Sequence, residues 1–184
     1  LCSAGIEKVI IKTHGEPLAP LCPTIARQFV IELLGPHFST RLNLINVEDF
    51  TKQREIAVEH TTSTKSDTFT DNVVATVTTR EGTRSIEGTV FVDGLPRILA
   101  IDTYRMDMVP EGAMVIVHNH DEPGVIGLVG TTFAQHKVNI ADMTLAREKD
   151  TALILLKIDE PAPAAAIEAL AAKTPPILFV KTVT

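Results

Sequence analysis

The sequence has 184 residues, 45% of them hydrophobic and 22% charged, and its mean hydropathy is +0.17, which is typical of a globular protein and excludes general disorder. Lys and Arg number 17 and Asp and Glu 23, so the formal net charge is −6, and the chain has no Trp and one Tyr. An acidic chain without a basic run or stacking aromatics is not expected to bind nucleic acid. No apolar run reaches the ~20 residues of a membrane span, so no membrane partner is expected either.

The first third of the chain predicts strands and helices in alternation. Apolar residues at helical spacing follow Pro23, and Gly35-Pro36 ends that helix. In chain order we predict a strand at 6–13, a helix at 23–34, a helix at 45–54, a strand at 56–59 and an exposed polar connection at 61–70.

The middle of the chain is β-rich. We predict strands at 72–79, 85–92, 97–101 and 106–109, with short turns at Arg80-Glu81-Gly82 and Asp93-Gly94. Consecutive strands with tight turns indicate an antiparallel sheet, and the two early helices can cover one face of it. This predicts an α+β domain over residues 1–110, which ends at the Pro110-Glu111-Gly112 punctuation.

Residues 111–184 predict a second domain. The expected elements are a strand at 113–117, a helix at 124–136, strands at 138–146 and 151–158, a helix at 161–173 and a strand at 177–183. The order β-α-β-β-α-β is that of a ferredoxin-like fold, with four strands under two helices.

The segment HNHDEPGVIG, residues 118–127, is the best candidate for a binding site. It ends a strand and opens a helix at Pro123-Gly124, so free N–H groups and the positive end of the helix dipole can receive a carboxylate. Gly124 has no Cβ, so a small ligand can approach the backbone. Asn119, Asp121 and Asn139 offer acceptors for an ammonium group if their strands lie side by side. The alternative is that Asn119 and Asp121 only cap the helix and stabilise the loop.

Other reactive side chains give weaker indications. His118 and His120 could share a strand face, but no third ligand is placed, so solvent-facing histidines are expected and no metal site. Cys2 and Cys22 make neither a disulfide framework nor a common metal site, and a reducing, cytoplasmic location is expected. No motif for nucleotide binding, hydrolysis or metalloprotease chemistry occurs, so no catalytic residue is predicted.

Two segments carry a resemblance to known families. HNHDEPGVIG together with Val138-Asn139-Ile140-Ala141 resembles the signature of ACT domains, which sense amino acids. Residues 88–112, GTVFVDGLPRILAIDTYRMDMVPEG, and residues 41–56, RLNLINVEDFTKQREI, resemble the intervening domain of long-form D-3-phosphoglycerate dehydrogenases. The resemblance spans roughly residues 5–184.

The resemblance implies a function. It identifies the chain as the regulatory part of an NAD-dependent dehydrogenase that oxidises 3-phosphoglycerate in the first step of L-serine biosynthesis. In serine-responsive relatives the positions of Asn119, Asp121, Pro123, Gly124 and Asn139 contact the amino acid, commonly across a dimer interface. In some relatives, basic residues at or near Arg97, Arg105 and Lys157 bind phosphate-bearing anions. A solvated basic surface is the simpler reading of those three residues.

We therefore expect a regulatory fragment of a longer protein, since the chain begins at Leu1 without Met. Without the catalytic and NAD-binding domains it should hold no cofactor and be inactive alone. L-serine is the expected effector, and homo-oligomerisation through both domains is expected. One alternative is an oligomerisation module that has lost ligand sensitivity. The other is the regulatory part of an L-serine dehydratase.

Overall fold

The computed structural model describes residues 5–64 and 71–183, and the chain divides into two compact units, Leu1–Pro96 and Arg97–Thr184. The division falls earlier than the domain boundary predicted at residue 110. The reason is that residues 97–108 form a hairpin whose apolar side chains share a core with the second unit. None of the helices within the described ranges is long and apolar enough to cross a membrane.

The first unit contains two α-helices and four strands, β1 to β4, of a six-stranded sheet. Its elements are β1 (Ile6–His14), the 3₁₀ helix η1 (Glu16–Leu21), α1 (Cys22–Leu34), the 3₁₀ helix η2 (Gly35–His37), α2 (Val47–Gln53), β2 (Ala57–Ser63), β3 (Asn72–Thr79) and β4 (Gly82–Val90). The strand order is β2-β1-β3-β4. The strand predicted at 56–59 is longer than expected, and residues 65–70 of the predicted polar connection lie outside the described residues.

The α+β class is confirmed, but the first sheet is mixed rather than antiparallel throughout. β1 and β2 pair in parallel, with Val9 opposite Val58, whereas β1 with β3 and β3 with β4 are antiparallel. The parallel pair follows from the connection, because β1 reaches β2 through two helices, and a long helical crossover returns the chain to the same end of the sheet.

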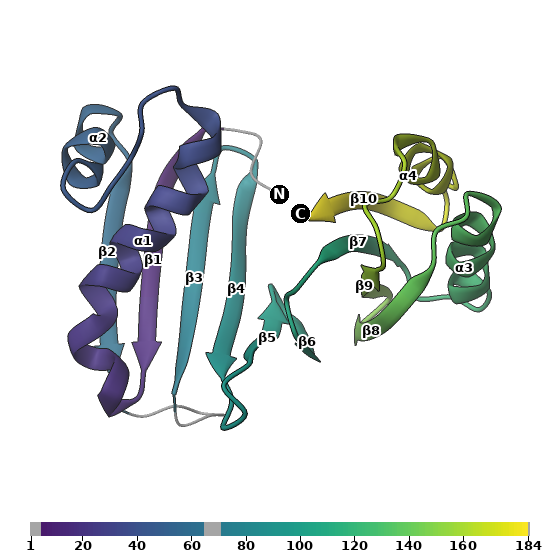
Figure 1. Ribbon diagram of the computed structural model, residues 1–184, viewed down its shortest axis with the longest axis horizontal. Helices are drawn as coiled ribbons and strands as arrows, with labels where there is room; N and C mark the ends of the chain where they lie inside the picture. Colours follow the sequence, from purple (N-terminus) through teal and green to yellow (C-terminus); the bar gives the residue numbers. More distant parts are fainter. Residues whose placement is uncertain (1–4, 65–70, 184) are drawn as a thin grey trace. The chain divides into compact units, whose positions relative to one another are not determined.

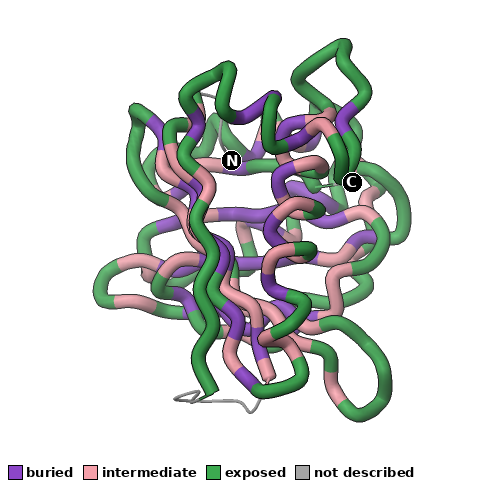
Figure 2. The backbone as a smooth tube through the Cα atoms, turned by 90° about the vertical axis from the view of Figure 1, so that its left-hand side faces the viewer, coloured by how far each residue is buried: buried purple, intermediate pink, exposed green. Residues whose placement is uncertain are grey.

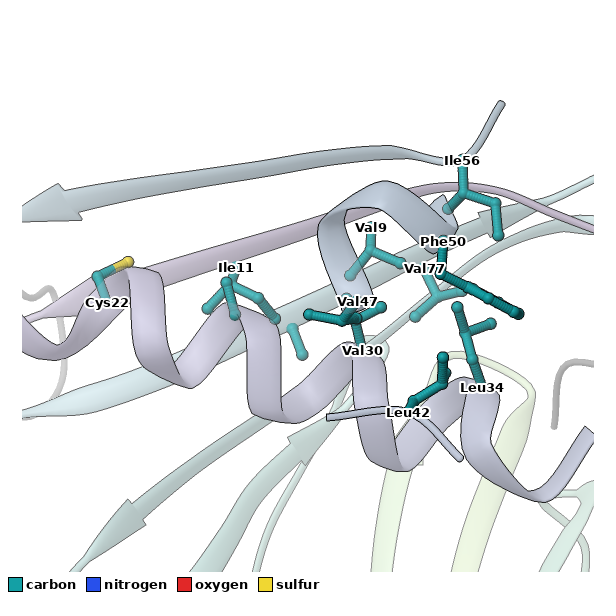
Figure 3. Close-up of a cluster of buried hydrophobic side chains, with 12 residues drawn as sticks. Val9, Ile11, Cys22, Val30, Leu34, Leu42, Val47, Phe50, Ile56 and Val77 are labelled. Atoms are coloured by element: carbon teal, nitrogen blue, oxygen red, sulfur yellow. The ribbon is translucent and has the colours of Figure 1, made fainter. Parts of the chain in front are cut away.

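The core of the first unit lies between the sheet and α1 (Figure 1). Alternate β1 residues Val9, Ile11 and Thr13 are buried, and α1 buries one residue per turn. Figure 3 shows Val30 and Leu34 of α1 in the same cluster as Val9 and Ile11. The helix thus covers one face of the sheet, as the sequence predicted.

The second unit contains the predicted ferredoxin-like sheet. Its elements are β5 (Pro96–Ile101), which begins at the unit boundary, β6 (Tyr104–Met108), β7 (Ala113–His120), α3 (Val125–Gln135), β8 (Ile140–Glu148), β9 (Thr151–Ile158), α4 (Ala164–Ala171) and β10 (Ile177–Val183). The strand order is β10-β7-β9-β8, and all three neighbouring pairs are antiparallel. The βαββαβ prediction is confirmed.

Both faces of this second sheet are covered. α3 and α4 pack on one face, where Phe133 and Leu170 contact Ile154 and other strand residues. The β5–β6 hairpin covers the other face, where Ile98 and Met108 pack with Leu155. Figure 2 colours the backbone by burial and shows that buried stretches of the chain alternate with exposed ones.

Candidate functional site

Asn119 lies near the end of β7 and is 2% exposed. It shares a strand face with Val115 and Val117, which belong to the core under α3 and α4. Its Nδ2 donates to the carbonyl oxygen of His120 at 2.6 Å, while its buried Oδ1 has no hydrogen-bond partner among the described residues. A buried acceptor without a donor costs ~1–3 kcal/mol, so a hydrogen-bond donor that reached this oxygen would stabilise the structure.

The start of α3, a few residues after Asn119 in the chain, has backbone N–H groups that no side chain caps. Gly124 is the N-cap residue, with a left-handed φ of 96° that favours glycine, and no side chain caps the helix. A Cβ built at Gly124 would meet nothing within 4 Å, so the surrounding space is open. The alternative in which Asn119 or Asp121 caps this helix is therefore not what the structure shows. The first N–H groups of α3 remain available to an anion.

Asp121 holds the loop between β7 and α3. Its backbone N–H donates to the carbonyl of Asp150 at 2.9 Å, and its Oδ1 lies 3.3 Å from Nε of Arg147. Arg147 is well exposed, so this ion pair is weak and screened. Asp121 is thus near the predicted site, but its carboxylate already has a cationic partner.

Asn139, which precedes β8, lies at the other end of the sheet. β9 separates β7 from β8, so the expectation that the strands of Asn119 and Asn139 lie side by side is wrong. Asn119 is opposite Ala152 in β9, whereas Ile140 is opposite Ile158. The six-residue offset along β9 corresponds to about 20 Å at ~3.3 Å per residue. One copy of the chain therefore does not bring the two asparagines together.

Asn139 instead lines a separate cavity of about 340 Å³. Its Nδ2 donates to Oδ2 of Asp159 at 2.7 Å. Asp159 was not among the predicted residues. The cavity is lined by His136, Lys137, Val138, Asn139, Asp159, Glu160, Pro161 and Pro163.

The three basic residues of the possible anion site have different surroundings. Arg97 lies 3.9 Å from the carboxylate of Asp107, and Lys157 pairs with Glu111. The hydrogen bond and then the charge of Lys157 hold the pKa of Glu111 below its usual value. Arg105 is exposed. Two of the three cations thus have carboxylate partners, and the anion site stays a prediction.

His118 faces the hairpin rather than solvent. Thr151 donates its hydroxyl hydrogen to the carbonyl of Glu148 at 3.0 Å, so its oxygen accepts from Tyr104 Oη at 2.6 Å. Tyr104 Oη then accepts from Nε2 of His118 at 2.8 Å, because a hydroxyl has a single hydrogen. His120 is exposed, as expected.

The remaining candidates for metal or redox chemistry are few. Within residues 5–64 and 71–183, no group of three or more His, Cys, Asp or Glu side chains could hold a metal ion. Cys22 is a buried free thiol whose Sγ donates to the carbonyl of Thr61 at 3.4 Å. Cys2 lies outside the described residues.

Comparison with known families and proteins matches both units. Residues 1–102 match the model of the D-3-phosphoglycerate dehydrogenase intervening domain, and residues 113–173 match that of the ACT domain. The chain is similar to the D-3-phosphoglycerate dehydrogenase of Archaeoglobus fulgidus, with 30% identity over 85% of this chain and 30% of the relative. The enzyme of Methanocaldococcus jannaschii is 30% identical over 89% of this chain and 31% of the relative. That of Bacillus subtilis is 25% identical over 84% of this chain and 30% of the relative.

The chain therefore spans about a third of the length of these relatives, and what it matches is their intervening and ACT domains. The intervening-domain model covers more than half of the sequence. On this basis the chain belongs to the family of D-3-phosphoglycerate dehydrogenase intervening domains, and an ACT domain follows in the same polypeptide.

Proposed function

We propose that this chain is the regulatory part of a D-3-phosphoglycerate dehydrogenase and that its ACT domain binds L-serine for feedback control. The parent enzyme would catalyse the NAD-dependent oxidation of 3-phosphoglycerate, the first step towards L-serine. In this proposal residues 1–110 are the intervening domain and residues 111–184 the ACT domain. The chain alone carries out no oxidation, because chemistry and cofactor binding belong to the parent's other domains.

The observation that carries the proposal is the buried, unpartnered Oδ1 of Asn119, which lies five residues before Gly124 at the uncapped start of α3. The N–H groups of α3 suit the carboxylate of a free amino acid, and Gly124 leaves space for it. Oδ1 of Asn119 then accepts from the hydroxyl or ammonium group of the same ligand. Pro123 and Asp121 hold the loop in which these groups lie. A small polar amino acid such as serine supplies both an acceptor and donors.

Asn139 enters this site from a second copy of the chain. Within one copy it lies at the opposite end of the sheet, about 20 Å along β9. In a two-fold dimer the same two patches meet twice, so each ligand would bridge Asn119 of one copy and Asn139 of the other. Binding regulates the parent only if serine prefers one arrangement of the copies over another.

Calorimetric titration of L-serine into the chain tests the proposal. We expect heat of binding in the wild type and a rise of at least about tenfold in Kd for either Asn119→Ala or Asn139→Ala, the loss expected from one ligand hydrogen bond. Mixing the two variants should restore binding in part, because a mixed dimer contains one intact bridged site. Absence of heat from the wild type at millimolar serine would contradict the proposal.

A ligand-insensitive oligomerisation module is the second candidate. It is favoured by the ion pair between Asp121 and Arg147, which already satisfies a residue assigned to the ligand. Sedimentation with and without L-serine separates the two, because a scaffold keeps the same assembly in both conditions. The third candidate is that the parent enzyme is an L-serine dehydratase. The coding sequence upstream of Leu1 distinguishes an L-serine dehydratase from a dehydrogenase.

A further inference from the structure

We propose that Asp159 is a positioning residue that makes Asn139 a hydrogen-bond acceptor and so selects an effector that carries an ammonium group. This inference rests on the proposed function, since it assigns the chemistry of one part of that site. Asp159 is the residue after β9, and its carboxylate lies at the start of β8.

Two hydrogen bonds join Asp159 and Asn139 in opposite directions. Nδ2 of Asn139 donates to Oδ2 of Asp159 at 2.7 Å, and the backbone N–H of Asp159 donates to the carbonyl of Asn139 at 3.3 Å. A register shift between Ile140 and Asp142 follows at once in β8. Such irregularities re-aim side chains at the end of a strand. The pair is thus held by the backbone and the side chain together.

The chemistry of the pair fixes which way the amide faces. A carboxylate only accepts hydrogen bonds, so the NH₂ group of Asn139 must be turned towards Asp159. This leaves Oδ1 as the free end of the amide, and no described residue donates to it. A free amide oxygen attracts an ammonium group and repels a carboxylate. Asn139 therefore recognises the amino end of the effector.

The charges around the cavity favour the same end of the ligand. Asp159 and Glu160 are carboxylates, and the C-terminal end of α3 at His136 adds the negative end of a helix dipole. His136 and Lys137 are the basic side chains among the lining residues. Lys137 carries a full positive charge on a flexible, exposed stem, so it can turn towards solvent.

Comparison of L-serine with glycerate tests the selection. Glycerate has the same carboxylate and CH₂OH group as L-serine. The two molecules differ at one position, where glycerate carries a hydroxyl group and L-serine an ammonium group. We expect the wild type to bind L-serine at least about tenfold more tightly than glycerate by calorimetry, the value of one charge-assisted hydrogen bond. In Asp159→Leu the Kd for L-serine should rise about tenfold while that for glycerate stays the same, so the preference disappears.

Two matched variants separate positioning from charge and from general damage. Asp159→Asn keeps an acceptor for Asn139 but removes the negative charge, so it should retain part of the preference. Glu168→Gln removes an exposed carboxylate of α4 that does not line the cavity, and it should leave both Kd values unchanged.

The hydrogen bond itself can be checked without a ligand. In NMR spectra of the ligand-free chain, the side-chain NH₂ resonances of Asn139 should differ in position between the wild type and Asp159→Leu, and they should be unchanged in Glu168→Gln. L-serine binding with an unchanged preference over glycerate in Asp159→Leu would overturn the inference and leave the proposed function intact. No binding of L-serine to the wild type would overturn both, even if the NMR shift is present.

Discussion

The sheets of the two units bury their strands in different ways. In the first unit β1 alternates, with Val9, Ile11 and Thr13 buried under α1 and Lys12 exposed on the other face. In the second unit β9 is buried without interruption from Ala152 to Leu156, because helices cover one face and the hairpin covers the other. An unbroken apolar strand thus indicates two covered faces, even in an antiparallel sheet, whereas alternation indicates one.

The largest expected effect is in β9 and tests its two-sided burial. Ile154 faces the helices and Leu155 faces the hairpin, and each is at most 1% exposed. We expect Ile154→Ala and Leu155→Ala each to lower the free energy of unfolding by about 2–5 kcal/mol, because each leaves a cavity in a filled core. Denaturant unfolding of the two variants measures this. A small loss for Leu155→Ala alone would mean that the hairpin does not seal its face of the sheet.

The matched experiment in the first unit should show a difference between neighbours. Ile11 is fully buried under α1, while Ile10 is on the opposite face of β1 and only partly buried. Ile11→Ala should cost about 2–5 kcal/mol, and Ile10→Ala should cost less than half of that, since less apolar area is removed from contact. Equal losses in denaturant unfolding would contradict the one-sided description of this sheet.

The smallest expected effect concerns the surface of the first unit, between α1 and α2. Glu48 accepts a hydrogen bond from Arg27 at 2.7 Å, and this bond and then the charge of Arg27 lower the pKa of Glu48. A lowered pKa gives a stabilising contribution above the ordinary glutamate pKa of ~4.3, which is lost as the pH falls through the folded-state pKa. Arg27→Met should therefore raise the pKa of Glu48 in an NMR titration, and its effect on unfolding should disappear in acid. A pKa of Glu48 unchanged in Arg27→Met would show that the pair does not persist in solution.

Most of the fold could be predicted because the apolar periodicity is local. The helix that follows Pro23 and the strand at 151–158 agree with α1 and β9 to within one residue at each end. The parallel pairing of β1 with β2 was missed, although the two helices between them indicate a crossover. The packing of residues 97–108 in the core of the second unit could not be predicted from local pattern, because it depends on contacts with Leu153 and Leu155, far along the chain.

The relations among the candidate site residues differ in how local they are. Asn119 and Gly124 are five residues apart, so their relation follows from one strand and one helix. The relation of Asn119 to Asn139 depends on strand order, and there the prediction was wrong. Asp159 could be placed from the turn at Lys149-Asp150 only to within one residue. Counting back along both strands from that turn puts Asn139 opposite Glu160, and the register shift between Ile140 and Asp142 changes the pairing by one residue.

The hairpin of residues 97–108 sets where the ACT domain can be cut or transplanted. A shortened chain that began at residue 111 would keep all four strands and both helices of the ferredoxin-like fold. It would also expose to water the sheet face that contains Met114, Ile116, Leu153 and Leu155. Uncovered apolar surface of this kind promotes aggregation or adventitious pairing. The smallest segment that we expect to fold and remain soluble on its own therefore includes β5 and β6 as well as the four-stranded sheet and its two helices.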